Sequence, residues 1–377
     1  MTSLINLLLL WSLVARIALP APTSFSTRDS CLISCTTSPI PPKQDPWYIT
    51  PPESLNTPPP GTILRIRKAP GSLTSIISNS SAAYNILYRT TDSQYQPTWA
   101  VTTLFVPKST TSAPGKTLLS YQIPYDSLNL NASPSYSLYA SPAPSVVSLA
   151  LGRGWHVVVG DYEGPKASFT AGVMSGHAVL DGVRAALSAE CLGTFGLSSN
   201  AKYSMFGYSG GALAVEWAAE LQGLYAPDLE FAGAALGGLT PNLTRVRDAV
   251  EGGPNAGLSP LSIVGITSQY PAARQYVVSR LKTSGPYNAT TFLGVENGTS
   301  TAATFAYQNI SDYFVGGMAD FNVPLLNEVV WRDGIMGYHG VPKMPLFVYQ
   351  AINVPHPHPG HPHMWDTQKC LINTASL

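Results

Sequence analysis

Charged residues are scarce in this sequence. Asp, Glu, Lys and Arg make up 11% of its 377 residues, whereas about 25% is usual in soluble domains. The 21 basic residues are matched by 21 acidic ones, so the sequence offers no basic surface for nucleic acid and no acidic tail. No nucleic-acid partner is therefore expected. Surface polarity must come from Ser, Thr, Asn and Gln, or from attached sugar, which is typical of secreted proteins.

Cysteine is also scarce, and no spacing between cysteines indicates a zinc site. The four cysteines could form two disulfides in three possible pairings. Only the first two are close in sequence, and no His or Cys pair stands near them. The cysteines are Cys31, Cys35, Cys191 and Cys370. No metal ligation by cysteine is expected.

Long apolar runs are confined to the N-terminus. The run from Leu4 to Val14 has the length of a signal peptide, and the small residues Ala18 and Ala21 follow it. No Lys or Arg precedes the run, and Arg16 falls late in it. The run is too short and too interrupted for a good membrane span. Residues 1–21 are therefore predicted to be a cleaved signal peptide rather than an uncleaved anchor, and no transmembrane span is expected.

Six sequons for N-glycosylation lie downstream of this run. A single Asn-x-Ser/Thr arises often by chance. Six together, four of them between residues 242 and 309, favour a secreted, extracellular glycoprotein. Their acceptors are Asn79, Asn131, Asn242, Asn288, Asn297 and Asn309.

The order of strand and helix patterns predicts an α/β fold. Residues 22–62 are rich in Pro, Ser and Thr and predict an irregular segment. In residues 63–240 strands alternate with helices, as in a mostly parallel sheet with helices on both faces. Residues 241–335 break the alternation and predict an inserted helical cap, and residues 336–353 return to a core strand. The expected strands are 63–67, 84–90, 100–106, 117–121, 155–161, 203–206, 231–236 and 344–350; the expected helices include 173–192, 212–221 (closed by Gly223) and 272–281.

The turn Gly207-Tyr208-Ser209-Gly210-Gly211 matches the nucleophile elbow, in which a serine stands between a strand and a helix. The sharp turn requires small residues two before and two after the serine, and Gly207 and Gly211 meet this need. Such a turn lifts the Ser209 hydroxyl above the sheet and directs N–H groups at the helix start toward developing negative charge. The alternative is a Gly-rich turn without chemistry. The flanking strand and helix favour a catalytic serine.

Several segments resemble the fungal secretory lipase family of the α/β-hydrolase superfamily. They span nearly all of residues 45–352 and are Asp45–Tyr48, Ile86–Asp92, Leu119–Gln122, Gly207–Gly211 and Pro345–Ile352. The resemblance implies an α/β-hydrolase fold and hydrolysis of carboxylic esters, notably acylglycerols at a lipid–water interface. It implies neither a metal nor an organic cofactor. The elbow alone would also serve a peptidase or an acyltransferase.

The resemblance also implies an oxyanion hole. In the family an Asp-Ser pair follows the Ser-Tyr-Gln-like strand, and its backbone N–H acts together with that of the residue after the nucleophile. The corresponding residues here are Asp126, within Tyr125-Asp126-Ser127, and Gly210. The alternative is that Asp126-Ser127 is only a polar turn after a strand.

Two other groups of polar residues have weaker functional claims. Asp161 and Glu163 end a strand and could form an acid–base pair, but solvated acids at the start of a loop are favoured. His177 precedes Ser209, whereas the triad order in this fold is Ser, acid, His. A structural histidine is therefore expected.

The acid and the histidine of the triad are not identifiable. The family places the acid in an Asp-Glu pair after an Ala-Ile, but this chain continues from Ile352 to Asn353 and Val354. The family's last strand and its histidine loop have no counterpart. We hypothesise that non-coding sequence, such as an unspliced intron, has been translated after Asn353. A spliced transcript that encodes the tail unchanged would contradict this.

Residues 354–377 form a tail rich in His and Pro, with four of the seven histidines at 356, 358, 361 and 363. Alternating proline holds a chain extended and removes backbone donors, which favours disorder. Clustered imidazoles can instead bind a metal, and one of them could act as the base. Three functions follow: a secreted serine-dependent ester hydrolase, an inactive truncated hydrolase-like glycoprotein, and a metal-binding protein.

Overall fold

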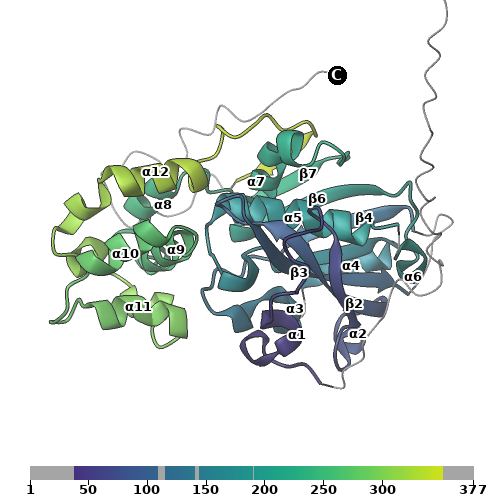
Figure 1. Cartoon of the computed structure of the whole chain (residues 1–377), viewed down its shortest axis with the longest axis horizontal. Coiled ribbons are helices and arrows are strands. Elements are labelled where there is room, and N and C mark those ends of the chain that lie inside the picture. The colour runs from purple at the N-terminus through teal and green to yellow at the C-terminus, as the bar shows by residue number, and fades with distance from the viewer. Residues whose placement is uncertain (1–37, 109–114, 141–143, 190, 351–377) are drawn as a thin grey trace, which may run out of the picture. The chain divides into compact units, whose positions relative to one another are not determined.

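A mostly parallel sheet of eight strands organises the computed structural model, which describes residues 38–108, 115–140, 144–189 and 191–350 (Figure 1). The strand order is β1-β2-β3-β5-β4-β6-β7-β8. The run from β5 to β8 is parallel, and β1, β2 and β3 join it by antiparallel pairing. The strands are β1 (Ile63–Lys68), β2 (Ser80–Thr91), β3 (Pro97–Pro107), β4 (Thr117–Gln122), β5 (His156–Gly160), β6 (Lys202–Tyr208), β7 (Ala234–Gly237) and β8 (Leu346–Tyr349).

Helices cover both faces of the sheet, which explains the continuously apolar strand β5. Val158 faces one side, where it belongs to the same core cluster as α5 and α7. Val157 and Val159 face the other side and pack in a cluster with α2 and α4. Alternate residues of a strand point to opposite faces, so a strand covered on both sides must be apolar throughout. The helices of this part are α1 (Pro46–Ile49), α2 (Leu73–Ile76), α3 (Pro134–Ser137), α4 (Ser145–Gly152), α5 (Gly172–Ala186), α6 (Leu192–Phe195) and α7 (Gly210–Tyr225), with 3-10 turns at 42–44, 130–132 and 164–166.

Residues 241–335 are mainly helical and have a hydrophobic cluster of their own. Its centre is aromatic: the ring of Phe292 contacts those of Phe305, Tyr313 and Phe314, and Phe305 also contacts Tyr313. These helices lie together beside the sheet (Figure 1). They are α8 (Leu243–Val250), α9 (Leu258–Thr267), α10 (Pro271–Arg280), α11 (Ala289–Asn297) and α12 (Pro324–Asp333), with 3-10 turns at 302–305, 310–313 and 317–321.

Two helix predictions need correction. Helix α7 does not end before Gly223 but runs to Tyr225, because Gly223 keeps a negative φ and so does not form the left-handed turn by which a glycine ends a helix. Helix α5 ends at Ala186, earlier than expected, and its polar side is buried. Asp181 is fully buried. Thr90, Arg184 and Tyr225 donate hydrogen bonds to its carboxylate and so replace the water that it would bind at the surface.

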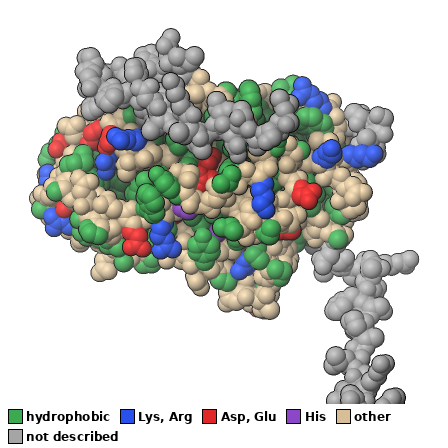
Figure 2. Space-filling view, turned by 90° about the horizontal axis from the view of Figure 1, so that it is seen from above, with side chains coloured by type: hydrophobic (Ala, Val, Ile, Leu, Met, Phe, Trp, Pro, Cys, Tyr) green, Lys and Arg blue, Asp and Glu red, His purple; other side chains and the backbone are tan. Residues whose placement is uncertain are grey.

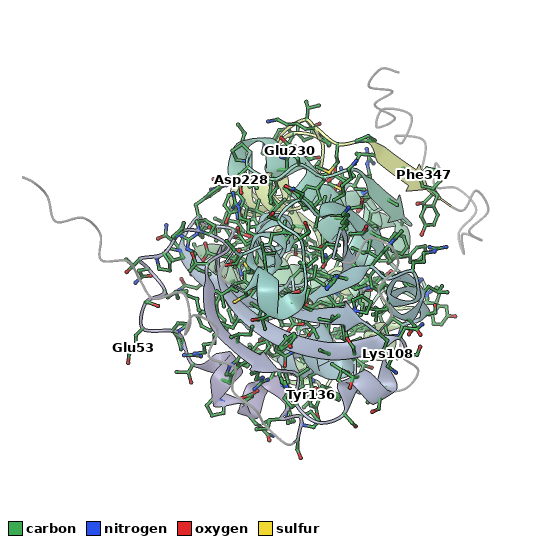
Figure 3. All side chains as sticks on the ribbon, turned by 90° about the vertical axis from the view of Figure 1, so that its right-hand side faces the viewer. Glu53, Lys108, Tyr136, Asp228, Glu230 and Phe347 are labelled. Carbon is green, nitrogen blue, oxygen red and sulfur yellow. The ribbon has the colours of Figure 1, made fainter. Side chains whose placement is uncertain are left out.

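Strand β8 lies at the end of the sheet, where it pairs with β7. Phe347 is 67% exposed, and its ring projects away from the strand (Figure 3). On the face seen in Figure 2, charged side chains are scattered among apolar and uncharged ones, as the low charge content predicts. No helix in the described part of the chain is long and apolar enough to cross a membrane.

Several predictions fall outside the described residues. They are the signal peptide at 1–21, the first part (22–37) of the irregular segment predicted at 22–62, and the tail at 354–377. Cys191 is buried and disulfide-bonded, but the other three cysteines are also outside these ranges. The division into core, cap and tail at the stated boundaries stays a prediction.

Candidate active site

Ser209 occupies a strained turn between β6 and α7. Its backbone has φ 52° and ψ −121°, a region that non-glycine residues rarely adopt and that is often found at functional sites. Two backbone hydrogen bonds hold the turn: Ser209 N–H donates to Gly237 O at 2.8 Å, and Leu213 N–H donates to Ser209 O at 3.0 Å. The preceding residue, Tyr208, is half exposed.

The glycines of the turn are required by close backbone packing. A Cβ on Gly207 would overlap the carbonyl of Gly211. A Cβ on Gly211 would overlap the carbonyl of Gln122 at the end of β4. Both obstacles are backbone atoms, which cannot move aside as a flexible side chain can. The small residues expected from the sequence therefore allow β4, β6 and α7 to meet at Ser209.

Asp126 follows β4 and lies beside the same turn. Its backbone has a positive φ of 40°, and its carboxyl group packs so closely on Gly210 that a Cβ there would overlap Oδ1. Asp126, Ser209 and Gly210 line one pocket. The fold thus brings together two residues, Asp126 and Ser209, that are 83 positions apart in sequence.

Of two acidic side chains at or near this turn, Asp126 is partly buried and Glu163 is fully buried. Burial raises the pKa of Asp126 to about 6. Burial, together with the charge of Asp126, raises the pKa of Glu163 well above its usual range. Neither carboxylate oxygen of Glu163 has a hydrogen-bond partner within the described residues. The neutral, protonated form of Glu163 is therefore favoured.

The prediction of solvated acids at the end of β5 is wrong. Asp161 and Glu163 are both fully buried. Asp161 accepts hydrogen bonds from Ser135 N–H at 2.8 Å, Ser135 Oγ at 2.6 Å and Tyr48 Oη at 2.8 Å. These bonds come from segments 26 and 113 residues away in sequence, and they replace the water that a surface acid would have.

The pocket beside Ser209 has a volume of about 330 Å³. Its floor is formed by the elbow and Leu213 of α7, and its other walls come from α8, α9 and α12 and from the segment before α5. Both apolar and hydroxyl-bearing side chains line it. The apolar ones are Phe169, Leu213, Leu243, Val246, Leu258, Ile263, Ile266, Phe321, Leu326, Val329 and Val330, and the hydroxyl-bearing ones are Thr170, Ser209, Thr240, Thr244, Ser259, Ser262 and Thr267.

None of the histidines at described positions lines this pocket. His156 contacts Phe195 O at 2.7 Å through Nε2, and His339 pairs with Glu220. His177 is buried between Tyr95 and Tyr225, with Nδ1 3.1 Å from Thr91 O. Burial lowers the pKa of His177 to about 3, which fits the expected structural role. The sequence positions where the family has its acid and histidine lie beyond residue 350 and are not described.

The described ranges contain no group of three or more His, Cys, Asp or Glu side chains that could hold a metal ion. The pocket does contain two carboxylates, Asp126 and Asp248. Asp248 is exposed and paired with Arg247 at 2.8 Å. The carboxylate beside Ser209 is thus Asp126, whose backbone rather than side chain is implicated by the resemblance.

The sequence alone does not indicate that residues of α8, α9 and α12 line the pocket beside Ser209. Helix α9 contributes Ser259, Ser262 and Thr267, which share one side of the helix with Ile263 and Ile266. Their spacing is the i, i+3, i+4, i+7 pattern of a helix face. This pattern could have suggested a face of mixed polarity, but it could not have shown that the face lies opposite Ser209.

Known proteins share this architecture. A model described as secretory lipase matches residues 141–355, more than half of the chain. Trichothecene C-3 esterase of Fusarium sporotrichioides is 49% identical over 332 residues, which cover 85% of this chain and 74% of that protein. A probable inactive lipase of Mycobacterium tuberculosis is 38% identical over 327 residues, 84% of this chain and 71% of that one. Candida antarctica lipase A in its closed state has a TM-score of 0.72 at 28% identity, covering 84% of this chain and 75% of the other. This α/β-hydrolase chain belongs to the secretory lipase family.

Proposed function

We propose that this protein hydrolyses carboxylic esters through an acyl-enzyme formed on Ser209. The observation that carries the proposal is the strained turn at Ser209, which opens into a pocket together with Asp126 and Gly210. Nucleophiles of this fold stand on such a turn. The lipases and the esterase among its relatives support ester hydrolysis as the reaction.

The reaction would proceed in two steps. Ser209 Oγ attacks the ester carbonyl carbon, and the carbonyl oxygen becomes an oxyanion that accepts hydrogen bonds from the N–H groups of Asp126 and Gly210. Collapse of this intermediate breaks the bond to the alcohol oxygen, which receives the proton removed from Ser209 and leaves as the alcohol, while the acyl group stays on Ser209. Water then attacks the acyl-enzyme, releasing the carboxylic acid and restoring the serine hydroxyl. This mechanism uses neither a metal nor an organic cofactor.

The base that takes the Ser209 proton is not assigned to a residue, because none of the pocket residues at described positions is a histidine. The triad acid and histidine are therefore left unnamed.

The substrate is proposed to be an acylglycerol or another ester met at a lipid–water interface. Lipase A of Candida antarctica and the trichothecene esterase of Fusarium sporotrichioides differ in the substrates that their names state. A pocket of about 330 Å³ is at the lower end of the roughly 300–1,000 Å³ usual for small-molecule sites. It favours esters of which one compact part enters the protein.

The protein is proposed to be secreted and glycosylated. The low charge content, the six sequons and the disulfide-bonded Cys191 support this. Asn297 and Asn309 are exposed. N-terminal sequencing of protein from the culture medium should begin near residue 22, and endoglycosidase treatment should reduce its apparent mass. Retention of residues 1–21 in the mature protein would contradict the signal peptide.

A second candidate is a hydrolase-like glycoprotein that binds esters without turnover. It is favoured by the lack of a histidine among the pocket residues at described positions, and one relative is named probable inactive lipase. A p-nitrophenyl butyrate assay on the wild type and on Ser209→Ala separates the two. Hydrolysis that disappears in the variant supports the enzyme, and no hydrolysis in either supports the inactive protein. Zinc or nickel binding that is lost on deletion of residues 354–377 would instead support the metal-binding alternative.

A further inference from the structure

Helix α9 presents hydroxyl groups to the pocket beside Ser209. Ser259 and Ser262 lie about one turn apart on the side of the helix that lines the pocket. Thr267 lies about two turns after Ser259 on the same side. Thr170, from the segment before α5, adds a fourth hydroxyl at the same wall. An alkyl chain cannot form hydrogen bonds with polar groups at the pocket wall. Each of these hydroxyls must therefore be hydrogen-bonded within the protein or to a polar ligand.

Ser259 has a hydroxyl without a partner. The residue is 3% exposed, and its Oγ makes no hydrogen bond within the described part of the protein. Burial of an unsatisfied hydroxyl is unfavourable, and such groups are rare in native proteins. Ser259 lines the pocket, and its Oγ is itself buried at the wall. Rotation of the side chain about χ1 to another staggered rotamer would bring Oγ to the pocket surface, where a ligand oxygen or nitrogen would give it the missing hydrogen bond.

Ser262 is paired with Thr170 across the pocket wall. Thr170 Oγ1 lies 2.9 Å from Ser262 Oγ and is 3.4 Å from Ser262 O. Thr170 is β-branched yet has a positive φ of 65°, a conformation that is strongly disfavoured for such a residue. The hydroxyl pair at the wall is thus formed by a residue with a strained backbone conformation, as is often found at functional sites. A hydroxyl pair can both donate to and accept from a ligand.

Thr267 differs from these residues although it lies on the same face. Its Oγ1 donates to Ile263 O of its own helix at 2.6 Å. Its hydroxyl is therefore already satisfied and is not needed by a ligand. This makes Thr267 the matched control for Ser259.

We infer that the pocket beside Ser209 selects compact esters that carry an ether, hydroxyl or carbonyl oxygen on the part facing α9, and that Ser259 and Ser262 determine this preference. The inference rests on the proposed function for the placement of the ester at Ser209. Around these hydroxyls, Ile263, Ile266 and Phe321 supply apolar contacts, so the ligand has an apolar framework with one or a few oxygen atoms. The volume of about 330 Å³ suits a compact group within this space.

The test measures binding rather than turnover, in Ser209→Ala protein that cannot consume the ligand. Two pairs of esters of nearly equal shape are titrated by ligand-observed NMR. Tetrahydropyran-4-yl butyrate is compared with cyclohexyl butyrate, and cyclohexyl 3-methoxypropanoate is compared with cyclohexyl pentanoate. The first pair places the additional oxygen in the alcohol part, and the second places it in the acyl part.

The oxygen-bearing ester of at least one pair should bind roughly 3- to 10-fold more tightly, the size expected for one neutral hydrogen bond. Ser259→Ala or the double variant Ser259→Ala/Ser262→Ala should remove this preference, whereas Thr267→Val should retain it. Equal affinities within both pairs, or a preference that survives in the double variant, would overturn the inference. Ser259→Ala should fold at least as stably as its parent because it deletes an unsatisfied hydroxyl.

The outcome is independent of whether the protein is an active enzyme. A preference found in Ser209→Ala protein, together with no hydrolysis by the wild type, would support the pocket assignment and refute the proposed catalysis. Hydrolysis by the wild type without any preference would do the opposite.

Discussion

The carboxyl group of Asp126 lies directly against the Cα atom of Gly210, with no space for a Cβ between them. This contact joins the loop after β4 to the start of α7. It fixes the separation of the two backbone segments whose N–H groups are proposed to hold the oxyanion. The first two predictions follow from it.

Gly210→Ala should abolish most of the activity while leaving the fold intact. The new methyl group would displace Asp126, so at least one oxyanion donor would move, and loss of one donor typically lowers kcat by about 100- to 1,000-fold. The check is kcat/KM for p-nitrophenyl butyrate together with the Tm. Gly193→Ala is the control, because a Cβ at Gly193 meets nothing. Full activity in Gly210→Ala would argue against the assigned oxyanion hole.

Asp126→Asn should change the pH profile of the reaction. Burial raises the pKa of Asp126 to about 6, so the group is neutral below this pH and negative above it. A negative charge here opposes oxyanion formation. Ionisation of Asp126 should therefore lower kcat/KM as the pH rises through about 6. Asparagine keeps the backbone N–H and stays neutral, so this fall should disappear. Asp248→Asn, at the exposed side of the pocket, should leave the profile unchanged.

Asp333→Asn should make the stability less dependent on pH. Burial raises the pKa of Asp333 from 3.8 to about 6 in the folded protein, so the folded state holds this proton more tightly than the unfolded state. Protonation of Asp333 therefore contributes up to about 3 kcal/mol to the free energy of unfolding. This contribution is complete below about pH 4 and is lost as the pH rises through about 6. The measurement is the Tm of both proteins from about pH 5 to about pH 8.

Asp228→Asn provides the contrast for Asp333→Asn. Hydrogen bonding from Arg184 lowers the pKa of Asp228, so the stability that it provides is lost only as the pH falls below its usual titration range. Between about pH 5 and about pH 8 the slope for Asp228→Asn should equal that of the wild type. An unchanged slope for Asp333→Asn would contradict the assigned titration of Asp333.

Glu220→Gln should destabilise the connection between α12 and β8. The Glu220 carboxylate accepts hydrogen bonds from the N–H groups of Gly337 and His339 and pairs with His339 Nδ1 at 3.3 Å. An amide retains only one accepting oxygen, so the free energy of unfolding should fall by about 1–3 kcal/mol. Urea titration measures this difference. Glu230→Gln should have no comparable effect, because Glu230 is exposed in the loop before β7 (Figure 3).

The sheet and the elbow could be predicted because their signals are local. The apolar run Val157–Val159 and the glycines around Ser209 depend only on neighbouring sequence. Each is required by covalent geometry or by burial on both faces of a strand. The same locality explains why all eight strands were expected near their observed positions, with errors mainly at their ends.

The pocket and the buried acids could not be predicted because they depend on distant partners. Asp161 resembles a surface acid until Tyr48 and Ser135 are placed beside it. Ser259 resembles an ordinary polar residue at a helix start until α9 lies opposite Ser209. Contacts of this kind are decided by tertiary packing, which leaves no periodic trace in the sequence.

The two walls of the pocket belong to different hydrophobic clusters. Leu213 packs in the cluster of the sheet, whereas Leu261 and Val264 of α9 pack in the cluster centred on Phe292. Substitutions that repack the second cluster can therefore reshape the substrate space without disturbing the support of Ser209. Evolution could therefore change which esters fit the pocket by altering the second cluster, while the turn at Ser209 and its supporting sheet stay the same.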